Sequence, residues 1–144
     1  MSRGTRIALF VGLGLVLLVV ATCGGVYACF QMNADRLAEE GKAAMRDGAH
    51  FGGGQQAPAC VDEALRRLDQ GDLGIVGEAT NKVFLEACLG VAARPAGFCD
   101  GIPPRDQLIA SATWAVARCG QLGHPGSQPC SRLVGAIQER CLAP

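Results

Sequence analysis

The sequence predicts an all-α protein in which an N-terminal transmembrane helix precedes a small, disulfide-stapled bundle of about four helices. Three observations predict this class. A long apolar run lies near the N-terminus, most of the cysteines lie in the C-terminal part of the chain, and the segments between those cysteines carry apolar residues at helical spacing. No alternating strand pattern of useful length competes with this interpretation.

The apolar run extends from Ile7 to Phe30 and contains 24 residues without a charge. About 20 such residues are enough to cross the hydrocarbon core of a bilayer. Arg3 and Arg6 precede the run and no acidic residue accompanies them, which favours a cytoplasmic N-terminus. We therefore expect residues 1–6 in the cytoplasm and a membrane anchor over residues 7–30.

Two other fates of the same run remain open. Val20 and Ala21 precede Cys23 in a pattern related to lipoprotein processing, and cleavage by signal peptidase could follow Ala21 or Ala28. The run is longer than the core of an ordinary signal peptide, so the sequence favours an uncleaved anchor.

Small residues four positions apart occur within the run, in the pairs Ala21/Gly25 and Gly24/Ala28. Such spacing lets two membrane helices approach closely. Cys29 lies near the expected outer interface, where it could form an intermolecular disulfide. A homodimer through Ala21, Gly25, Ala28 and Cys29 is therefore one hypothesis.

The segment 31–59 is expected to connect the anchor to a folded domain. Residues 31–47 are predicted to form a helical stalk, and the Gly-, Gln- and Pro-containing segment 47–59 is predicted to be a flexible linker. The folded domain then occupies residues 60–144.

Four helices are expected in that domain, and the first and the fourth combine an apolar stripe with a start signal. The first follows Pro58 and carries Val61, Ala64, Leu65 and Leu68 at helical spacing, with Gly71 as a stop signal. The fourth, about 128–142, aligns Cys130, Leu133, Val134, Ile137 and Cys141, and Ser127 precedes it as a candidate N-cap.

The other two expected helices also carry apolar residues at helical spacing. In the second, about 74–92, the expected face comprises Val76, Val83, Ala87 and Val91, with Phe84 and Cys88 beside it. In the third, about 104–119, it comprises Leu108, Ile109, Ala112, Val116 and Cys119. Small residues cover the rest of this third helix, so we expect it to be the central, closely packed one.

Six of the eight cysteines lie in the domain, and their density predicts disulfides and an oxidising compartment. A domain of this size often needs such covalent support. Antiparallel neighbours bring together the helix ends that carry Cys60 and Cys88, and those that carry Cys119 and Cys130. Cys99 precedes the third helix by a few residues and must fold back to reach Cys141 at the end of the fourth. We predict these three pairs.

The composition indicates a bacterial protein, because 11 of the 13 basic residues are Arg and because Ala and Gly are abundant, as in GC-rich genomes. Together with the predicted disulfides, this makes the periplasmic face of a bacterial inner membrane the expected location.

Helices clamped by disulfides resemble, in principle, the coiled-coil-helix-coiled-coil-helix proteins and the saposin-like domains. The cysteine spacing of this chain differs from both, so neither resemblance transfers a functional residue.

Chemistry at these cysteines is not expected. No pair has the short spacing of a zinc site, of a Cys-x-x-Cys redox centre or of a haem attachment motif, so we predict no metal and no cofactor. Residues 31–144 carry 11 basic and 13 acidic residues, a balance that gives no reason to expect nucleic acid. The sequence therefore predicts a non-enzyme that binds the membrane through residues 7–30 and a protein partner through its domain. The alternative is a carrier of lipid or another apolar ligand in a cavity between helices.

Overall fold

A computed structural model describes residues 3–71 and 74–143 of the chain. The side chains of residues 3–11, 29, 30 and 32 lie outside the described part, so the hypothesis that Cys29 forms an intermolecular bond is not addressed by the structure. Residues 1–38 and 39–144 form two compact units, which are described separately.

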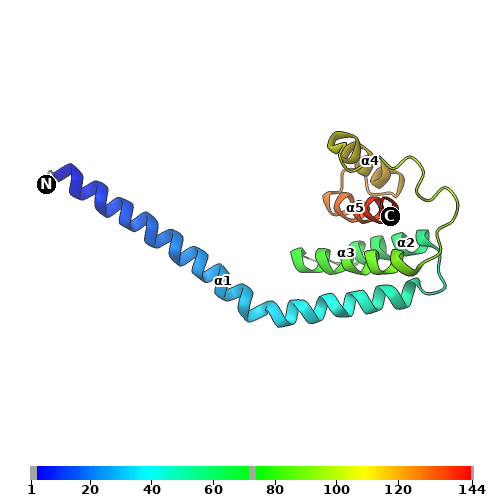
Figure 1. The fold of residues 1–144 in the computed structure, drawn as a ribbon, viewed down its shortest axis with the longest axis horizontal. Coiled ribbons are helices and arrows are strands. Elements are labelled where there is room, and N and C mark those ends of the chain that lie inside the picture. Colours follow the sequence, from blue (N-terminus) through cyan, green and yellow to red (C-terminus); the bar gives the residue numbers. More distant parts are fainter. Residues whose placement is uncertain (1–2, 72–73, 144) are drawn as a thin grey trace. The chain divides into compact units, whose positions relative to one another are not determined.

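The described residues form α-helices joined by turns and loops (Figure 1), namely α1 (Arg3–Gly52), α2 (Ala57–Asp69), α3 (Gly74–Val91), α4 (Leu108–Gln121) and α5 (Gln128–Cys141). Over these residues the only β-type pairing is an isolated bridge between Gln56 and Ala93. The all-α class is confirmed.

The first unit contains the apolar part of α1. Every described side chain from Gly12 to Ala28 is exposed, and the hydroxyl of Thr22 donates to the carbonyl oxygens of Leu18 and Val19, both at 2.9 Å. Taken singly, none of the described helices is both long and apolar enough to cross a membrane; a bent pair, Gly12–Ala28 with Asn33–Gly52, meets the requirement by length and composition.

The second unit has its core where α2, α3 and α5 meet, while α4 packs on α5. The predicted stripes of α2 and α5 are the ones that enter this core. Pro58 lies in the first turn of α2, and the side chain of Ser127 accepts a hydrogen bond from the backbone N–H of Cys130 at 3.3 Å. The buried apolar residues are Ala57, Cys60, Val61, Ala64, Leu65, Phe84, Leu85, Cys88, Leu89, Ala92, Cys119, Cys130, Leu133, Val134, Ala136 and Ile137.

The face of α3 that enters the core differs from the predicted one. Its buried residues are Asn81, Phe84, Leu85, Cys88 and Leu89, whereas Val76 and Val91 are exposed. Both faces are apolar, so periodicity alone could not choose between them. The Cys60–Cys88 disulfide and the contact with α5 turn the Leu85 side inward.

The predicted linker at 47–59 also differs from the structure. Residues 47–52 continue α1, and this part of the helix lies against α3, because a Cβ atom added at Gly48 would meet the Phe84 carbonyl oxygen and the Ala87 Cβ. At Gly52 an added Cβ would lie 2.8 Å from Val91 Cγ2. The glycines that predicted flexibility therefore permit close helix packing instead. The face of α3 expected in the core, which includes Ala87 and Val91, meets α1 here.

The start and the packing of α4 differ from the predicted third helix as well. Residues 104–107 form a turn closed by Gln107 N–H donating to Pro104 O at 3.2 Å, so the helix begins only at Leu108. Cys119 is its one buried residue among those described, with Trp114 and Ala115 partly buried against the core. The helix is therefore peripheral rather than central.

An ion-pair cluster joins α1, α2 and α3. Glu63 accepts hydrogen bonds from Arg66 and from Arg67, and Arg67 also lies 3.4 Å from Asp47 and 3.7 Å above the Phe84 ring. The hydrogen bond from Arg66, together with that from Arg67 and both positive charges, outweighs burial and lowers the pKa of Glu63 to about 2. Glu63 therefore stabilises α2 through its ion pairs with Arg66 and Arg67. It lies beyond the first turn of that helix.

Candidate functional site

The six domain cysteines are structural. Disulfides join Cys60 to Cys88, Cys99 to Cys141 and Cys119 to Cys130, which is the pairing predicted from the order of the helices. Cys23 carries a free, exposed thiol in the first unit. Within the described residues, no three His, Cys, Asp or Glu side chains gather in a way that could hold a metal ion.

Four residues of the predicted apolar stripe of α4 are exposed, whereas its fifth member, Cys119, is buried in a disulfide. We call the exposed part the α4 face and define it as Leu108, Ile109, Ala112 and Val116. At 100° per residue these four positions fall within one stripe about 100° wide. Leu108 is 77% exposed, Ile109 85% and Val116 55%. A stripe of this width normally faces a core, so its exposure indicates a surface that lacks its partner.

The two arginines near α4 make hydrogen bonds away from this face. Arg105 donates to the carbonyl oxygen of Glu139 on α5 at 2.8 Å, and Arg118 donates to Gln121 at 3.1 Å. The α4 face itself contains only uncharged, apolar side chains. It can therefore bury surface against another apolar surface without desolvating an ion.

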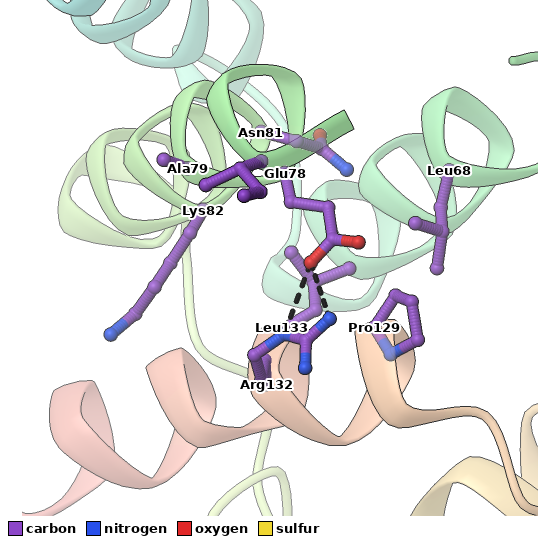
Figure 2. A pocket seen from close by; sticks show the side chains of 9 residues that line it. Leu68, Glu78, Ala79, Asn81, Lys82, Pro129, Arg132 and Leu133 are labelled. Atoms are coloured by element: carbon purple, nitrogen blue, oxygen red, sulfur yellow. Dashed lines mark hydrogen bonds and ion pairs between the residues drawn. The ribbon is translucent and has the colours of Figure 1, made fainter. Parts of the chain in front are cut away.

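A pocket of about 400 Å³ opens between α2, α3 and α5 (Figure 2). Aliphatic carbons from all three helices line it, and charged side chains stand at its rim. The lining residues are Leu68, Ile75, Glu78, Ala79, Asn81, Lys82, Pro129, Arg132 and Leu133. We call it the α3–α5 pocket.

Two ion pairs cross between α3 and α5 at the rim. Figure 2 shows Arg132 reaching Glu78, and the two hydrogen bonds measure 3.0 Å from Nε and 2.6 Å from the terminal nitrogen. Lys82 extends away from that pair and lies 3.2 Å from Glu139 and 3.4 Å from Glu86. The rim therefore carries compensated charges.

The electrostatics of Lys82 fit this arrangement. Burial by itself lowers the pKa of Lys82, but the hydrogen bond to Glu139 and the negative charges of Glu139 and Glu86 outweigh it, so the pKa lies above its ordinary value. Lys82 is therefore protonated at neutral pH. A base or nucleophile is not available at this rim position.

Asn81 is the polar residue buried beside this pocket. It is 5% exposed, and its Nδ2 donates to the Ala64 carbonyl oxygen on α2 at 2.8 Å. Its Oδ1 is buried and finds no hydrogen-bond partner among the described residues. Because the Ala64 carbonyl can only accept, the orientation of the amide is fixed and Oδ1 is the atom left over.

A second hollow of about 490 Å³ lies on the other side of the domain, between the loop 95–102 and the inner side of α4. Positive φ angles of 82° at Gly97 and 72° at Gly101 let this loop turn twice within a few residues. Trp114 and Phe98 are among its lining residues. Each of the three disulfides has a cysteine within two residues of this lining, so the hollow is bounded by covalently fixed segments.

The small residues proposed for a homodimer are all exposed on the described part of α1, and a Cβ atom added at Gly24 or Gly25 would meet nothing within 4 Å. Their dimer role therefore stays a prediction.

Sequence reasoning missed Asn81 and the pair Glu78–Arg132. A polar residue inside an apolar helical stripe was the available signal for Asn81, whereas the ion pair depends on which face of α3 meets α5.

Comparison with known proteins gives no match: no family model fits the chain, and neither a curated protein nor a solved structure is significantly similar to it.

Proposed function

We propose that this protein is a single-pass, membrane-anchored, non-enzymatic interaction module that uses the α4 face to hold an apolar surface of a protein partner. The observation that carries the proposal is the exposure of Leu108, Ile109 and Val116 on a helix whose inner side is joined to the core. Folded domains rarely leave an aliphatic stripe uncovered unless it binds something.

The anchor in this proposal is the apolar part of α1. Exposed apolar side chains from Gly12 to Ala28 and the internally satisfied hydroxyl of Thr22 suit a hydrocarbon environment. With Arg3 and Arg6 on the cytoplasmic side, the domain would face the periplasm of a bacterial inner membrane. Three disulfides suit that oxidising location.

The packing of Phe84 favours an interaction module over a lipid carrier. A carrier would need an internal cavity beside this ring, but Phe84 has no exposed surface and packs against Phe51 with the ring centroids 5.9 Å apart. The core that would have to open for an acyl chain is therefore filled. The uncharged α4 face indicates a partner surface that is apolar as well.

Site-specific crosslinking in native membranes tests the partner. A photoreactive amino acid at Ile109 should give a discrete product with one protein, and the same residue at exposed Gln128 on α5 serves as the matched control. A Val116→Glu substitution should abolish the Ile109 product, because it places a charge in the proposed interface. Equal products at both positions, or a product that survives Val116→Glu, would contradict the proposal. A product with a second copy of the chain would replace the partner by a homodimer.

The intact mass of the protein purified from membranes tests the anchor. The uncleaved chain is expected. A mass that corresponds to a chain starting at Cys23 with attached acyl groups, or to a chain starting after Ala21 or Ala28, would replace the anchor by lipoprotein processing or by signal cleavage.

A further inference from the structure

A second exposed apolar surface lies at the start of α3, and we call it the α3 tip, defined as Ile75 and Val76. Ile75 is 90% exposed, which makes it the most exposed large apolar side chain among the described residues, and Val76 is 43% exposed. The first charged residue of α3 is Glu78, and it is paired with Arg132 on α5. The first turn of α3 therefore presents apolar side chains without a charge among them.

The α3 tip lies at the end of the domain where α1 enters it. A Cβ atom added at Gly48 would meet Ala87, and one added at Gly52 would meet Val91, so α1 and α3 run parallel in this contact, as Figure 1 also shows. Both helices rise about 1.5 Å per residue. The same register places the α3 tip near the level of Glu39, the first residue of the second unit.

This end of the domain is covalently held near the membrane in the proposed function, on which the present inference rests. The apolar run ends at Phe30, and exposed Tyr27 is of the residue type that favours a membrane interface. Residues 31–38 are helical, so Glu39 lies about 13 Å further along α1 than Phe30.

That separation is small enough for the α3 tip to meet lipid. The headgroup layer of one leaflet is roughly 5–8 Å thick. When a membrane helix tilts by about 20–40°, a helix packed about 8–10 Å to one side of it is lowered by roughly 3–6 Å. A tilt of α1 toward α3 therefore brings Ile75 to the headgroup layer.

The charges around the α3 tip favour a contact driven by apolar burial. Arg132 is paired with Glu78, and Lys82 with Glu139, so these cations already have counter-charges within the protein. A shallow contact needs only Ile75 and its neighbour to leave water, and charged side chains nearby stay in the headgroups or in water. The contact should therefore form on zwitterionic lipid.

We propose that the α3 tip inserts Ile75 and Val76 into the interfacial layer of the same membrane that holds α1. The domain then has two attachments to the bilayer, a covalent one through α1 and a peripheral one through α3. The second attachment restricts rotation of the domain about α1, so the α4 face is presented to its partner in a restricted range of directions.

Methyl signals of isoleucine test the insertion on the full chain in zwitterionic lipid nanodiscs. Ile109 is the matched control for Ile75, because it is 85% exposed and is likewise the second residue of its helix. A water-soluble gadolinium chelate should abolish the Ile109 signal and spare that of Ile75. A lipid with a nitroxide near its headgroup should abolish the Ile75 signal. Ile7, in the apolar run, reports whether the anchor is in the bilayer.

Two substitutions extend the test. Ile75→Asp places a carboxylate in the proposed contact, so the chelate should then abolish the methyl signals of Val76, whereas Ile109→Asp should leave them protected. Both variants alter an exposed side chain at the same helix position, so both are expected to fold.

The outcomes separate this inference from the function on which it rests. Loss of the Ile75 signal with the chelate, or an Ile75 signal that survives the nitroxide lipid while that of Ile7 is lost, would overturn the insertion and leave the anchor standing. Equal protection of Val76 in both variants would overturn the insertion as well. An Ile7 signal that survives the nitroxide lipid would contradict the anchor and the insertion together.

Discussion

Helices α4 and α5 have the same length and are joined by one disulfide, yet they use their apolar stripes in opposite ways. In α5 the residues Cys130, Leu133, Val134, Ala136 and Ile137 are buried, whereas in α4 only Cys119 is buried within the described chain. The sequence pattern of the two helices is similar. An apolar stripe thus predicts that a helix face needs a partner, but it does not predict that the partner belongs to the same chain.

The strongest test of this contrast is a pair of alanine substitutions. Leu133→Ala removes a side chain that is 5% exposed and should lower the free energy of unfolding by about 3 kcal/mol, through lost burial and a residual cavity. Ile109→Ala removes one that is 85% exposed and should change it by less than about 0.5 kcal/mol. Urea unfolding of the full chain in nanodiscs, followed by the fluorescence of Trp114, measures both. A large loss at Ile109 would mean that the α4 face is already covered.

A second, smaller effect compares two glycines of α1, one on a helix face that packs against α3 and one on a face with open space around it. Gly48→Ala places a Cβ against the Phe84 carbonyl oxygen and should destabilise the protein by about 1–3 kcal/mol, because backbone atoms must move apart.

The control for this substitution lies two turns earlier in the same helix. Gly41 has open space around its Cβ position, so Gly41→Ala should be neutral or should stabilise by up to about 1 kcal/mol through helix propensity. The same unfolding measurement applies. Equal effects at both positions would indicate that residues 47–52 do not pack on α3.

The smallest expected effect is the dependence on pH of the stability that Glu63 contributes where α2 packs on its neighbours. The pKa of Glu63 is about 2 in the folded protein and 4.5 by reference, so the carboxylate favours folding above pH 4.5 and loses that contribution as the pH falls toward 2. The loss should be about 1 kcal/mol, because Arg66 is largely solvated. Urea midpoints at pH 5 and pH 2.5 measure it. Glu63→Gln should reduce this difference, and a variant with the same pH dependence would assign the effect to other carboxylates.

The elements that could be predicted from the sequence are those whose pattern offers one solution. In α2 and α5 a single stripe contains all the large apolar residues, and Pro58 and Ser127 mark the two starts by local chemistry. The disulfide pairs followed from the helix order, since five of the six cysteines lie near a helix end that an antiparallel neighbour reaches. Cys99 lies in the loop between α3 and α4 and folds back to Cys141.

The elements that could not be predicted are those in which several faces are equally apolar or a local signal has two meanings. Helix α3 offers Val83 and Leu85 on different sides, and only contacts with α1 and α5 decide between them. Gly48 and Gly52 suit both a flexible linker and a close helix contact. The unpaired oxygen of Asn81 was not predictable, because it arises only once the Nδ2 of the same amide donates to Ala64 on α2.

The bond between Cys99 and Cys141 closes a covalent ring that contains the whole of α4, and the bond between Cys119 and Cys130 closes a smaller ring inside it. A protease that cuts one peptide bond between residues 100 and 140 therefore opens a ring without releasing a fragment. Under oxidising conditions Leu108 and Ile109 stay attached to α5 after such a cut. These two exposed apolar residues are thus retained in the molecule after a cut by a protease, to which exposed segments are the most vulnerable.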